Sequence, residues 1–477
     1  MTEPATLPHA VSLKRTMGTR DLVLFNLVAV IGLRWLATSA KTGPSAITLW
    51  ILAAVLFFIP SGLAVAELST LYPNEGGIYA WTRRRFGEGH GFFCGWCYWI
   101  VNVMYYPQIL ISSAAISTFI FGKGTSGLAD SWPYVLTLSL ILLWIAVWFN
   151  IVGLSTGKWL ENIGGIGAYL AGIIVVAIGI YAFATRPSAN PITWANLVPD
   201  LHTLDGMYLW SSIAFAFAGL ELAATLGGEI KDPRRTLPRA VYLSAPLIAG
   251  CYLIGTAAML WLVPKDDVNV ITGLVQAIDV GARHTGVARW LAPLAAAAYT
   301  IGIVGTVGAW LTGPARVAFV IGLDKYFPPA FGRIHPKWGT PYVAIIVQAV
   351  VASFVMLLPL LGKGTGVADF YVAVLNAQIL IYFVPFIYLF GCLLFDRAAD
   401  RADRARDHVS MIPGGSLGRG VVGLSGVSVT IFAMVIGVVA RPSDISALRW
   451  TAEVFGGAAV FYVLGLAFYW VGRRSSS

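Results

Sequence analysis

The chain has 477 residues, of which 57% are hydrophobic and only 12% are charged. A soluble protein carries about twice that charged fraction, so the composition excludes a soluble domain of this size and indicates a polytopic membrane protein. The formal net charge of +9 is spread over short loops, a distribution that does not favour nucleic-acid binding. A membrane-spanning helix needs about 20 apolar residues, so the length holds about twelve spans with their loops.

Apolar segments long enough to cross a bilayer recur along the whole chain, and the Lys and Arg residues between them fall mostly in alternate loops. Basic loops favour the cytoplasmic side, so this distribution predicts that both termini are cytoplasmic. We expect spans at residues 21–41, 44–72, 89–121, 132–152, 160–184, 205–228, 238–263, 289–322, 341–361, 367–395, 419–440 and 450–472.

The first expected span is interrupted near its middle by Gly32-Leu33-Arg34-Trp35. A charged guanidinium and a glycine in mid-span are both unfavourable in a regular transmembrane helix. The third expected span carries Asn102, Tyr105 and Tyr106 near its middle, and these side chains either line a cavity or pack a helix seam.

The sixth expected span, at 205–228, contains Gly219 beside Glu221 in mid-span. A carboxylate at bilayer depth costs several kcal/mol unless it faces protein or water. A glycine weakens a helix by about 1 kcal/mol relative to alanine. The pattern favours a helix that is broken at the midplane around a polar cavity, as in many transporters. The alternative is a helix whose glutamate is paired in the bundle and whose glycines only allow close packing.

Two interrupted spans that lie five spans apart indicate a five-plus-five inverted repeat. Residues that carry enzyme chemistry are scarce in comparison. Cys94 and Cys97 have CxxC spacing, but they lie inside an expected span without a second pair, so we interpret them as buried thiols. The chain shows no nucleotide-binding loop, no metal-ligand cluster and no credible Ser/His/Asp set. We therefore expect no enzyme, no cofactor and no metal.

Three long stretches resemble the amino acid–polyamine–organocation (APC) transporters. They are similar to the second span, to the sixth span with its following loop, and to the eighth span with its internal loop of that family. Their sequences are AELSTLYPNEGGIYAWTRRRFG at 66–87, FAGLELAATLGGEIKDPRRTLPRA at 217–240 and GAWLTGPARVAFVIGLDKYFPPAFGRIHPKWGTPY at 308–342. WLVPKDDVNVITGLVQAID at 261–279 and IPGG at 412–415 lean toward the bacterial amino-acid antiporter branch, which includes glutamate/GABA exchangers.

The resemblance implies an all-α integral membrane protein with the leucine-transporter-type fold in the bacterial cytoplasmic (inner) membrane. That fold would have about 12 transmembrane helices, a five-plus-five inverted repeat with discontinuous helices 1 and 6, and two extra C-terminal helices. The corresponding segments are a cytoplasmic tail at 1–20, a ten-helix transport core at 21–395, a cytoplasmic loop at 396–418, helices 11 and 12 at 419–472, and a cytoplasmic tail at 473–477. The alternating charges of 396–407 predict a solvated helix end within that loop.

The resemblance also implies which residues bind substrate. Backbone groups of the broken first span would bind the substrate carboxylate, here at Ile31, Gly32, Leu33, Arg34 and Trp35.

In the broken sixth span, carbonyls near Phe215, Ala218 and Gly219 would bind the amino group. Phe215 matches a gating aromatic, Trp310 matches an aromatic that stacks on the substrate, and Glu221 matches a family glutamate.

Two departures from the family pattern bear on the mechanism. The usual Gly-x-Gly of the first span is Gly32-Leu33-Arg34, and a frequent span-five lysine that can replace a sodium ion is Gly167. Exchange is therefore favoured over lysine-based proton symport. The Arg34 guanidinium needs an anion, either Glu221 or a substrate carboxylate, unless it snorkels toward the outer vestibule. Either pairing favours neutral or acidic amino acids over polyamines.

We therefore expect a secondary active transporter, a permease or antiporter, that moves an amino acid by alternating access. Its partners would be the lipid bilayer and a small-molecule amino acid, with either a counter-exchanged amino acid or amine or a coupled proton or sodium ion as the second solute. The alternatives are a polyamine or organic-cation transporter of the same fold, and a membrane amino-acid sensor without net transport.

Overall fold

The computed structural model describes residues 15–73, 76–121, 127–152, 154–200, 207–285, 290–323, 326–361, 366–395, 397–407, 411–441 and 445–476. Every secondary-structure element among these residues is a helix, which confirms the all-α prediction. Residues 1–14 of the expected N-terminal tail lie outside the described residues.

The α-helices are α1 (Thr19–Val30), α2 (Arg34–Ala40), α3 (Ser45–Ala53), α4 (Ile59–Leu71), α5 (Ile78–Phe86), α6 (Glu88–Ser117), α7 (Trp132–Val152), α8 (Leu154–Thr185), α9 (Trp194–Leu197), α10 (Trp210–Ala216), α11 (Pro233–Leu262), α12 (Gly273–Thr285), α13 (Leu291–Leu323), α14 (Tyr342–Leu357), α15 (Val367–Leu394), α16 (Ala398–Asp407), α17 (Gly415–Val439), α18 (Ala447–Thr451) and α19 (Gly457–Ser476). Short 3-10 helices cover Thr118–Phe121, Met207–Leu209, Leu220–Glu229, Lys265–Asp267, Pro329–Gly332 and Leu358–Leu361, and π-helical turns cover Ala54–Phe58 and Ala452–Gly456.

Ten of the described helical segments are long and apolar enough to cross a membrane, and α1 with α2 adds an eleventh as one bent span. The ninth expected span, at 341–361, forms α14, which has only 16 residues before a 3-10 turn. The structure thus confirms a protein of many membrane spans, with ten to eleven qualifying candidates among the described residues where about twelve were expected.

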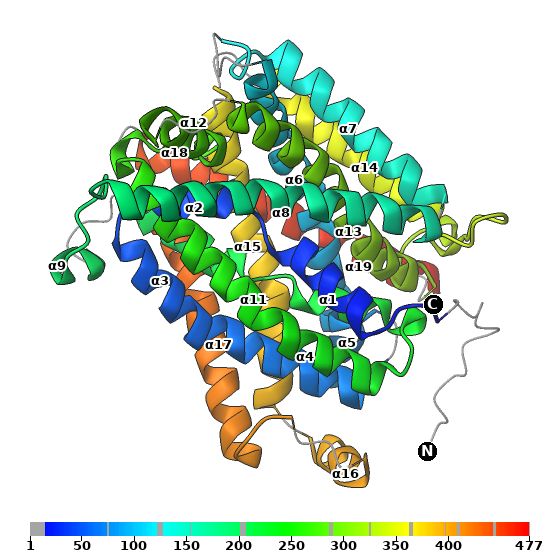
Figure 1. Ribbon diagram of the computed structural model, residues 1–477. Coiled ribbons are helices and arrows are strands. Elements are labelled where there is room, and N and C mark those ends of the chain that lie inside the picture. The colour runs from blue at the N-terminus through cyan, green and yellow to red at the C-terminus, as the bar shows by residue number, and fades with distance from the viewer. Residues whose placement is uncertain are drawn as a thin grey trace.

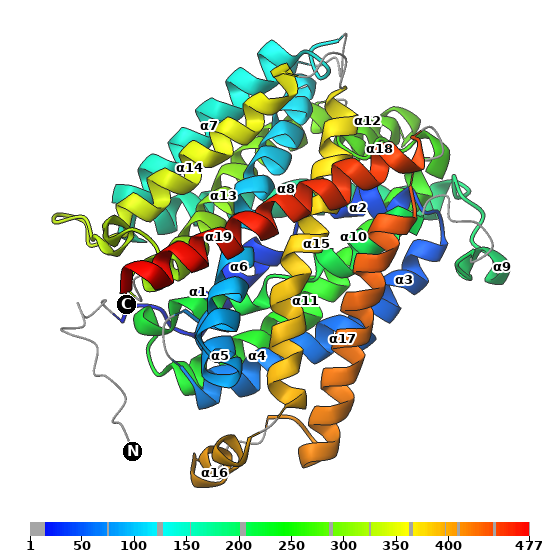
Figure 2. The same cartoon turned by 180° about the vertical axis from the view of Figure 1, so that it is seen from behind.

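The broken segments lie inside the bundle (Figures 1 and 2). The spans α6 and Met207–Glu229 are almost wholly buried, whereas α17 and α19 present most of their side chains outward. The start of α1, helix α5 and the end of α19 lie on one side of the molecule, and α2, α12 and α18 lie on the opposite side (Figure 1).

The first predicted break is confirmed. Helix α1 ends at Val30 and α2 begins at Arg34, and their axes differ by 45°. Gly32 lies between them against the indole of Trp35, where a Cβ atom would approach the ring to 2.8 Å. A larger residue at position 32 would therefore push the indole away.

The sixth span also breaks where the glycine predicted it. Helix α10 ends at Ala216, and the chain resumes as a 3-10 helix at Leu220. Gly219 has φ +130°, a conformation that side-chain-bearing residues rarely adopt. A Cβ atom there would lie 3.0 Å from Val30, so the two breaks pack against each other.

Candidate substrate-binding site

A cavity lies where the two breaks meet, and its free volume is about 20 Å³, which is room for about one water molecule. Its walls come from both broken spans and from α6, α13 and α15. The lining residues are Ala29, Val30, Arg34, Trp35, Val101, Asn102, Tyr105, Phe215, Ala216, Ala218, Trp310 and Tyr382.

Half of the ten predicted binding residues line this cavity, namely Arg34, Trp35, Phe215, Ala218 and Trp310. The other five, which are Ile31, Gly32, Leu33, Gly219 and Glu221, lie next to it without lining it.

Part of the backbone expected to hold a substrate carboxylate is already hydrogen-bonded within the protein. The amide of Ile31 donates to the Leu27 carbonyl, and the amide of Gly32 donates to the hydroxyl of Tyr252. These two amides are therefore not free to bind a substrate carboxylate in this conformation.

Five of the twelve residues that line the cavity are aromatic. Phe215 lies edge-on to Trp35 at 5.6 Å and to Tyr382 at 5.5 Å between ring centroids. Trp310 lies 5.1 Å from Tyr105. Aromatic faces attract cations and cover apolar groups, so this wall suits an ammonium group or an apolar side chain.

Arg34 is the charged residue of the cavity wall, and it is only 1% exposed. Its Cζ lies 4.1 Å from the Trp35 ring centroid and 5.1 Å from that of Tyr105. Its Nε and Nη1 atoms have no hydrogen-bond partner among the described residues, and no described carboxylate forms an ion pair with it. The guanidinium does not snorkel to water. Among the described residues it also lacks the anion that a buried cation requires.

Glu221 does not pair with Arg34, and its carboxylate accepts hydrogen bonds from three other groups. Its Oε2 accepts a 3.0 Å hydrogen bond from the Gly219 amide, and its Oε1 accepts bonds from the hydroxyls of Tyr98 and Tyr382. All three partners are donors, an arrangement that suits an ionised carboxylate. Because Tyr382 lines the cavity, Glu221 lies one side chain behind the wall.

The sequence interpretation missed three tyrosines that organise the site. Tyr98 and Tyr382 hold Glu221, and Tyr252 contacts both breaks. Asn102 and Tyr105 of the third span do line the cavity, and Tyr106 donates instead to the carbonyl of Trp310 at 2.9 Å. A tyrosine in an apolar segment looks the same in sequence whether it packs or donates a hydrogen bond.

A buried ion pair joins the end of the sixth span to α13. The guanidinium of Arg316 contacts the carboxylate of Glu229, and its Nη1 donates to the Thr312 carbonyl at 2.9 Å. The chain start pairs with the same segment, because the Met17 amide donates to the Glu229 carbonyl at 3.1 Å. These contacts join the start of the described chain, the end of the sixth span and α13.

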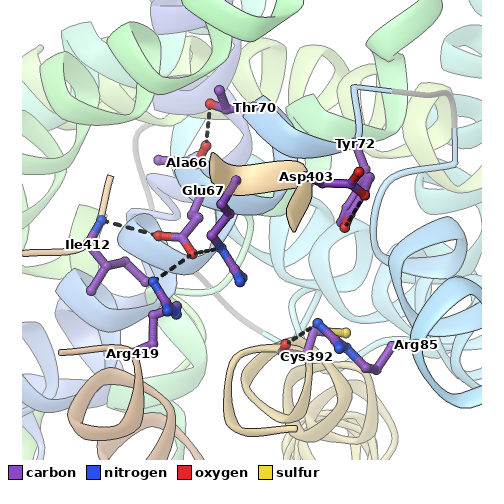
Figure 3. Close-up of polar contacts among 10 residues, drawn as sticks. Ala66, Glu67, Thr70, Tyr72, Arg85, Cys392, Asp403, Ile412 and Arg419 are labelled. Carbon is purple, nitrogen blue, oxygen red and sulfur yellow. Dashed lines mark hydrogen bonds and ion pairs between the residues drawn. The ribbon is translucent and has the colours of Figure 1, made fainter. Parts of the chain in front are cut away.

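A second buried ion pair involves the carboxylate of Glu67, near the end of α4. This carboxylate accepts hydrogen bonds from Arg404 Nε at 2.7 Å and from the Ile412 amide at 3.3 Å, and Arg419 lies 4.0 Å away (Figure 3). Arg404 belongs to α16 and is only 6% exposed. The prediction of a solvated helix end is therefore wrong for Arg404, because its guanidinium is buried in an ion pair with Glu67.

Gly167 bears on the expected departure in the fifth span. A Cβ atom at this position would lie 2.3 Å from the carbonyl oxygen of Ala298, because α8 and α13 cross in close contact there. A lysine side chain does not fit at position 167 in this arrangement.

Two interrupted spans that meet at a cavity inside a helical bundle are typical of the class of broken-helix membrane transporters. The sequence profile of the amino acid permease family matches residues 18–464, and the chain belongs to this family. This result confirms the APC resemblance and shows a transporter rather than an enzyme.

Three relatives illustrate the range of the family. An uncharacterised transporter of Legionella pneumophila is 31% identical over 94% of this chain and 95% of its own length. A probable agmatine/putrescine antiporter of Lactococcus lactis is 25% identical, and the match covers 74% of each chain. An aspartate/glutamate permease of Lactococcus lactis is 26% identical, and the match covers 72% of each chain.

Proposed function

We propose that this protein is a secondary active transporter that exchanges an α-amino acid across the bacterial cytoplasmic membrane by alternating access. The observation that carries the proposal is the buried guanidinium of Arg34 in the wall of the cavity, which forms no ion pair with a carboxylate of the described residues. Its missing anion would be supplied by the carboxylate of an amino acid. The aromatic residues of the wall would cover the ammonium group or the apolar side chain.

The proposal includes a five-plus-five arrangement of ten spans, two further C-terminal helices and cytoplasmic termini. The two breaks, their mutual packing and the shared side of α1 and the end of α19 support it (Figure 1). Exchange rather than lysine-based proton symport is supported by Gly167, where no lysine fits.

A polyamine transporter is the main alternative, since one relative is named as an agmatine/putrescine antiporter. The charge of Arg34 argues against it. A polyamine would bring two or more positive charges near a buried guanidinium, where the low dielectric screens repulsion poorly. An amino acid with a neutral or acidic side chain brings a carboxylate to the same place.

Exchange in proteoliposomes tests the proposal. Purified protein is reconstituted into liposomes that contain either a mixture of unlabelled amino acids or buffer alone, and labelled solutes are added outside. We expect labelled neutral or acidic amino acids to enter only the amino-acid-loaded liposomes, and putrescine and spermidine neither to enter nor to compete. Strong polyamine uptake without amino-acid uptake would favour the alternative substrate. Amino-acid binding without any exchange would favour a sensor.

A further inference from the structure

Tyr252 of α11 touches both breaks at once. Its hydroxyl oxygen lies 2.5 Å from the Val30 carbonyl oxygen in the first break and 3.0 Å from the Ala216 carbonyl oxygen in the sixth-span break. It also accepts a hydrogen bond of 3.1 Å from the Gly32 amide. The side chain is fully buried, so water does not compete for these groups.

These contacts answer a requirement of any broken span. Backbone groups that lose their helical partners inside a membrane must find others in the protein or in a ligand. In many transporters with discontinuous helices, unwound carbonyls hold a coupling cation. Here a phenol supplies the donor, and its single proton serves one of the two carbonyls at a time.

The phenol ring of Tyr252 packs against a tryptophan. It stacks on Trp50 with a centroid separation of 4.4 Å and an interplanar angle of 10°. Trp50 Nε1 donates to the hydroxyl of Thr256 at 2.9 Å, and that hydroxyl lies 3.0 Å from Ser39 Oγ. The stack therefore ties Tyr252 to α3, and the hydrogen bonds through Thr256 extend this contact to Ser39 of α2.

We propose that Tyr252 is a positioning residue for transport: its hydroxyl couples the two breaks and keeps the cavity in shape. Val30 and Ala216, whose carbonyls it contacts, both line the cavity. The Tyr252 hydroxyl therefore fixes the position of the α1 wall of the cavity relative to the α10 wall. The role in substrate affinity rests on the proposed exchange function, whereas the coupling of the two breaks does not.

The test compares Tyr252→Phe with Tyr462→Phe in the full-length protein. Phenylalanine keeps the ring on Trp50 and removes only the hydroxyl. Tyr462 is the matched control, because its hydroxyl donates a 2.8 Å bond to the Leu380 carbonyl on α15 and contacts neither break. We expect Tyr252→Phe to raise the KM for amino-acid exchange about tenfold, and Tyr462→Phe to leave it unchanged.

A second readout does not depend on the substrate. Amide hydrogen–deuterium exchange of substrate-free protein should quicken at both breaks, residues 31–36 and 216–222, in Tyr252→Phe and at neither break in Tyr462→Phe. Faster exchange at one break alone, or equal effects of both variants, would overturn the coupling. If both breaks loosen but the wild type exchanges no amino acid, the proposed function fails and the coupling stands.

Trp50→Phe provides the test should Tyr252→Phe not fold. It loses the hydrogen bond to Thr256 and part of the stacked surface, but it leaves the Tyr252 hydroxyl in place. We expect faster amide exchange at both breaks and a rise in KM of about threefold. Wild-type values in both measurements would overturn the inference.

Discussion

The indole Nε1 of Trp310 donates a 2.9 Å hydrogen bond to the carbonyl oxygen of Ala29, which ties α13 to the last turn of α1. The same ring forms part of the cavity wall. Trp310 thus has two physical roles that the sequence alone does not separate: it presents an aromatic face, and it fixes a backbone carbonyl at the first break.

The variant Trp310→Phe separates these roles. It keeps an aromatic face but leaves the buried Ala29 carbonyl without its donor, which costs about 1–3 kcal/mol. We expect the KM for exchange to rise about tenfold while the protein still folds. Trp290→Phe, at an exposed tryptophan just before α13, is the control and should exchange like the wild type. Equal KM values for the two variants would reduce Trp310 to a packing residue.

The sequence predicted those parts of the site where a glycine or a charged residue interrupts an otherwise apolar span. Gly219, Glu221 and Arg34 each contradict a regular apolar helix, so residue type alone was enough to locate both breaks. The contacts that hold the breaks were not predictable in this way. Tyr252 is compatible with an ordinary span, and its partners are backbone carbonyls that every residue has.

The sequence also did not predict which charged residues pair. Arg34 and Glu221 have opposite charges and similar expected depths, yet Glu221 accepts its hydrogen bonds from two tyrosines and one backbone amide. Opposite charges on neighbouring spans pair only if their rotamers and helix rotations agree, and these depend on the packing of the whole bundle. The same reasoning applies to Glu67, whose partner Arg404 lies 337 residues away.

Glu221→Gln should leave the protein folded but transporting poorly. Glutamine keeps the volume but replaces one acceptor oxygen by a donor, which then faces a donor from Tyr98, Tyr382 or Gly219. We expect the free energy of unfolding to fall by about 1–3 kcal/mol and exchange to fall more than tenfold. Exchange rates and thermal unfolding are measured on the same preparations. Wild-type exchange across pH 5 to 8 would remove Glu221 from the mechanism.

The orientation of the loops predicts a labelling pattern. Asp266 and Arg234 are exposed, in the loop after α11 and at the start of α11 respectively. The positive-inside rule places Asp266 outside and Arg234 inside. A membrane-impermeant thiol reagent added to intact cells should therefore label Asp266→Cys and not Arg234→Cys, and label both after permeabilisation. Unmodified protein, whose cysteines are buried or half-buried, gives the background. The reverse pattern would invert the topology.

The Glu67–Arg404 pair should contribute strongly to stability. Removing one partner of a buried ion pair leaves an uncompensated charge and costs about 3–5 kcal/mol. Glu67→Gln should therefore lower the melting temperature markedly, and the double variant with Arg404→Gln should regain part of the loss. Glu453→Gln breaks the exposed Arg449–Glu453 pair and should cost less than about 1 kcal/mol. Similar losses in Glu67→Gln and Glu453→Gln would contradict the buried pairing.

The last prediction concerns Arg34, whose buried charge lowers the stability of the substrate-free protein and is compensated only when an anion binds. A buried guanidinium without a partner loses its hydration and gains no compensating ion pair. Arg34→Gln should therefore raise the melting temperature of substrate-free protein, or leave it unchanged, while exchange kcat/KM falls about 100-fold or more, corresponding to about 2.7 kcal/mol. Arg34→Lys keeps the charge but not the planar fork, so it should retain part of the exchange.

Arg283→Gln is the control for Arg34→Gln, because it removes an exposed arginine whose partner is Asp279 on the same helix. It should change neither exchange nor stability by a measurable amount. The decisive comparison is the sign of the stability change at position 34. A variant that loses stability and exchange in parallel would make Arg34 a structural residue with an unseen partner. A variant that gains stability while losing exchange would identify a binding residue that the fold retains at a cost.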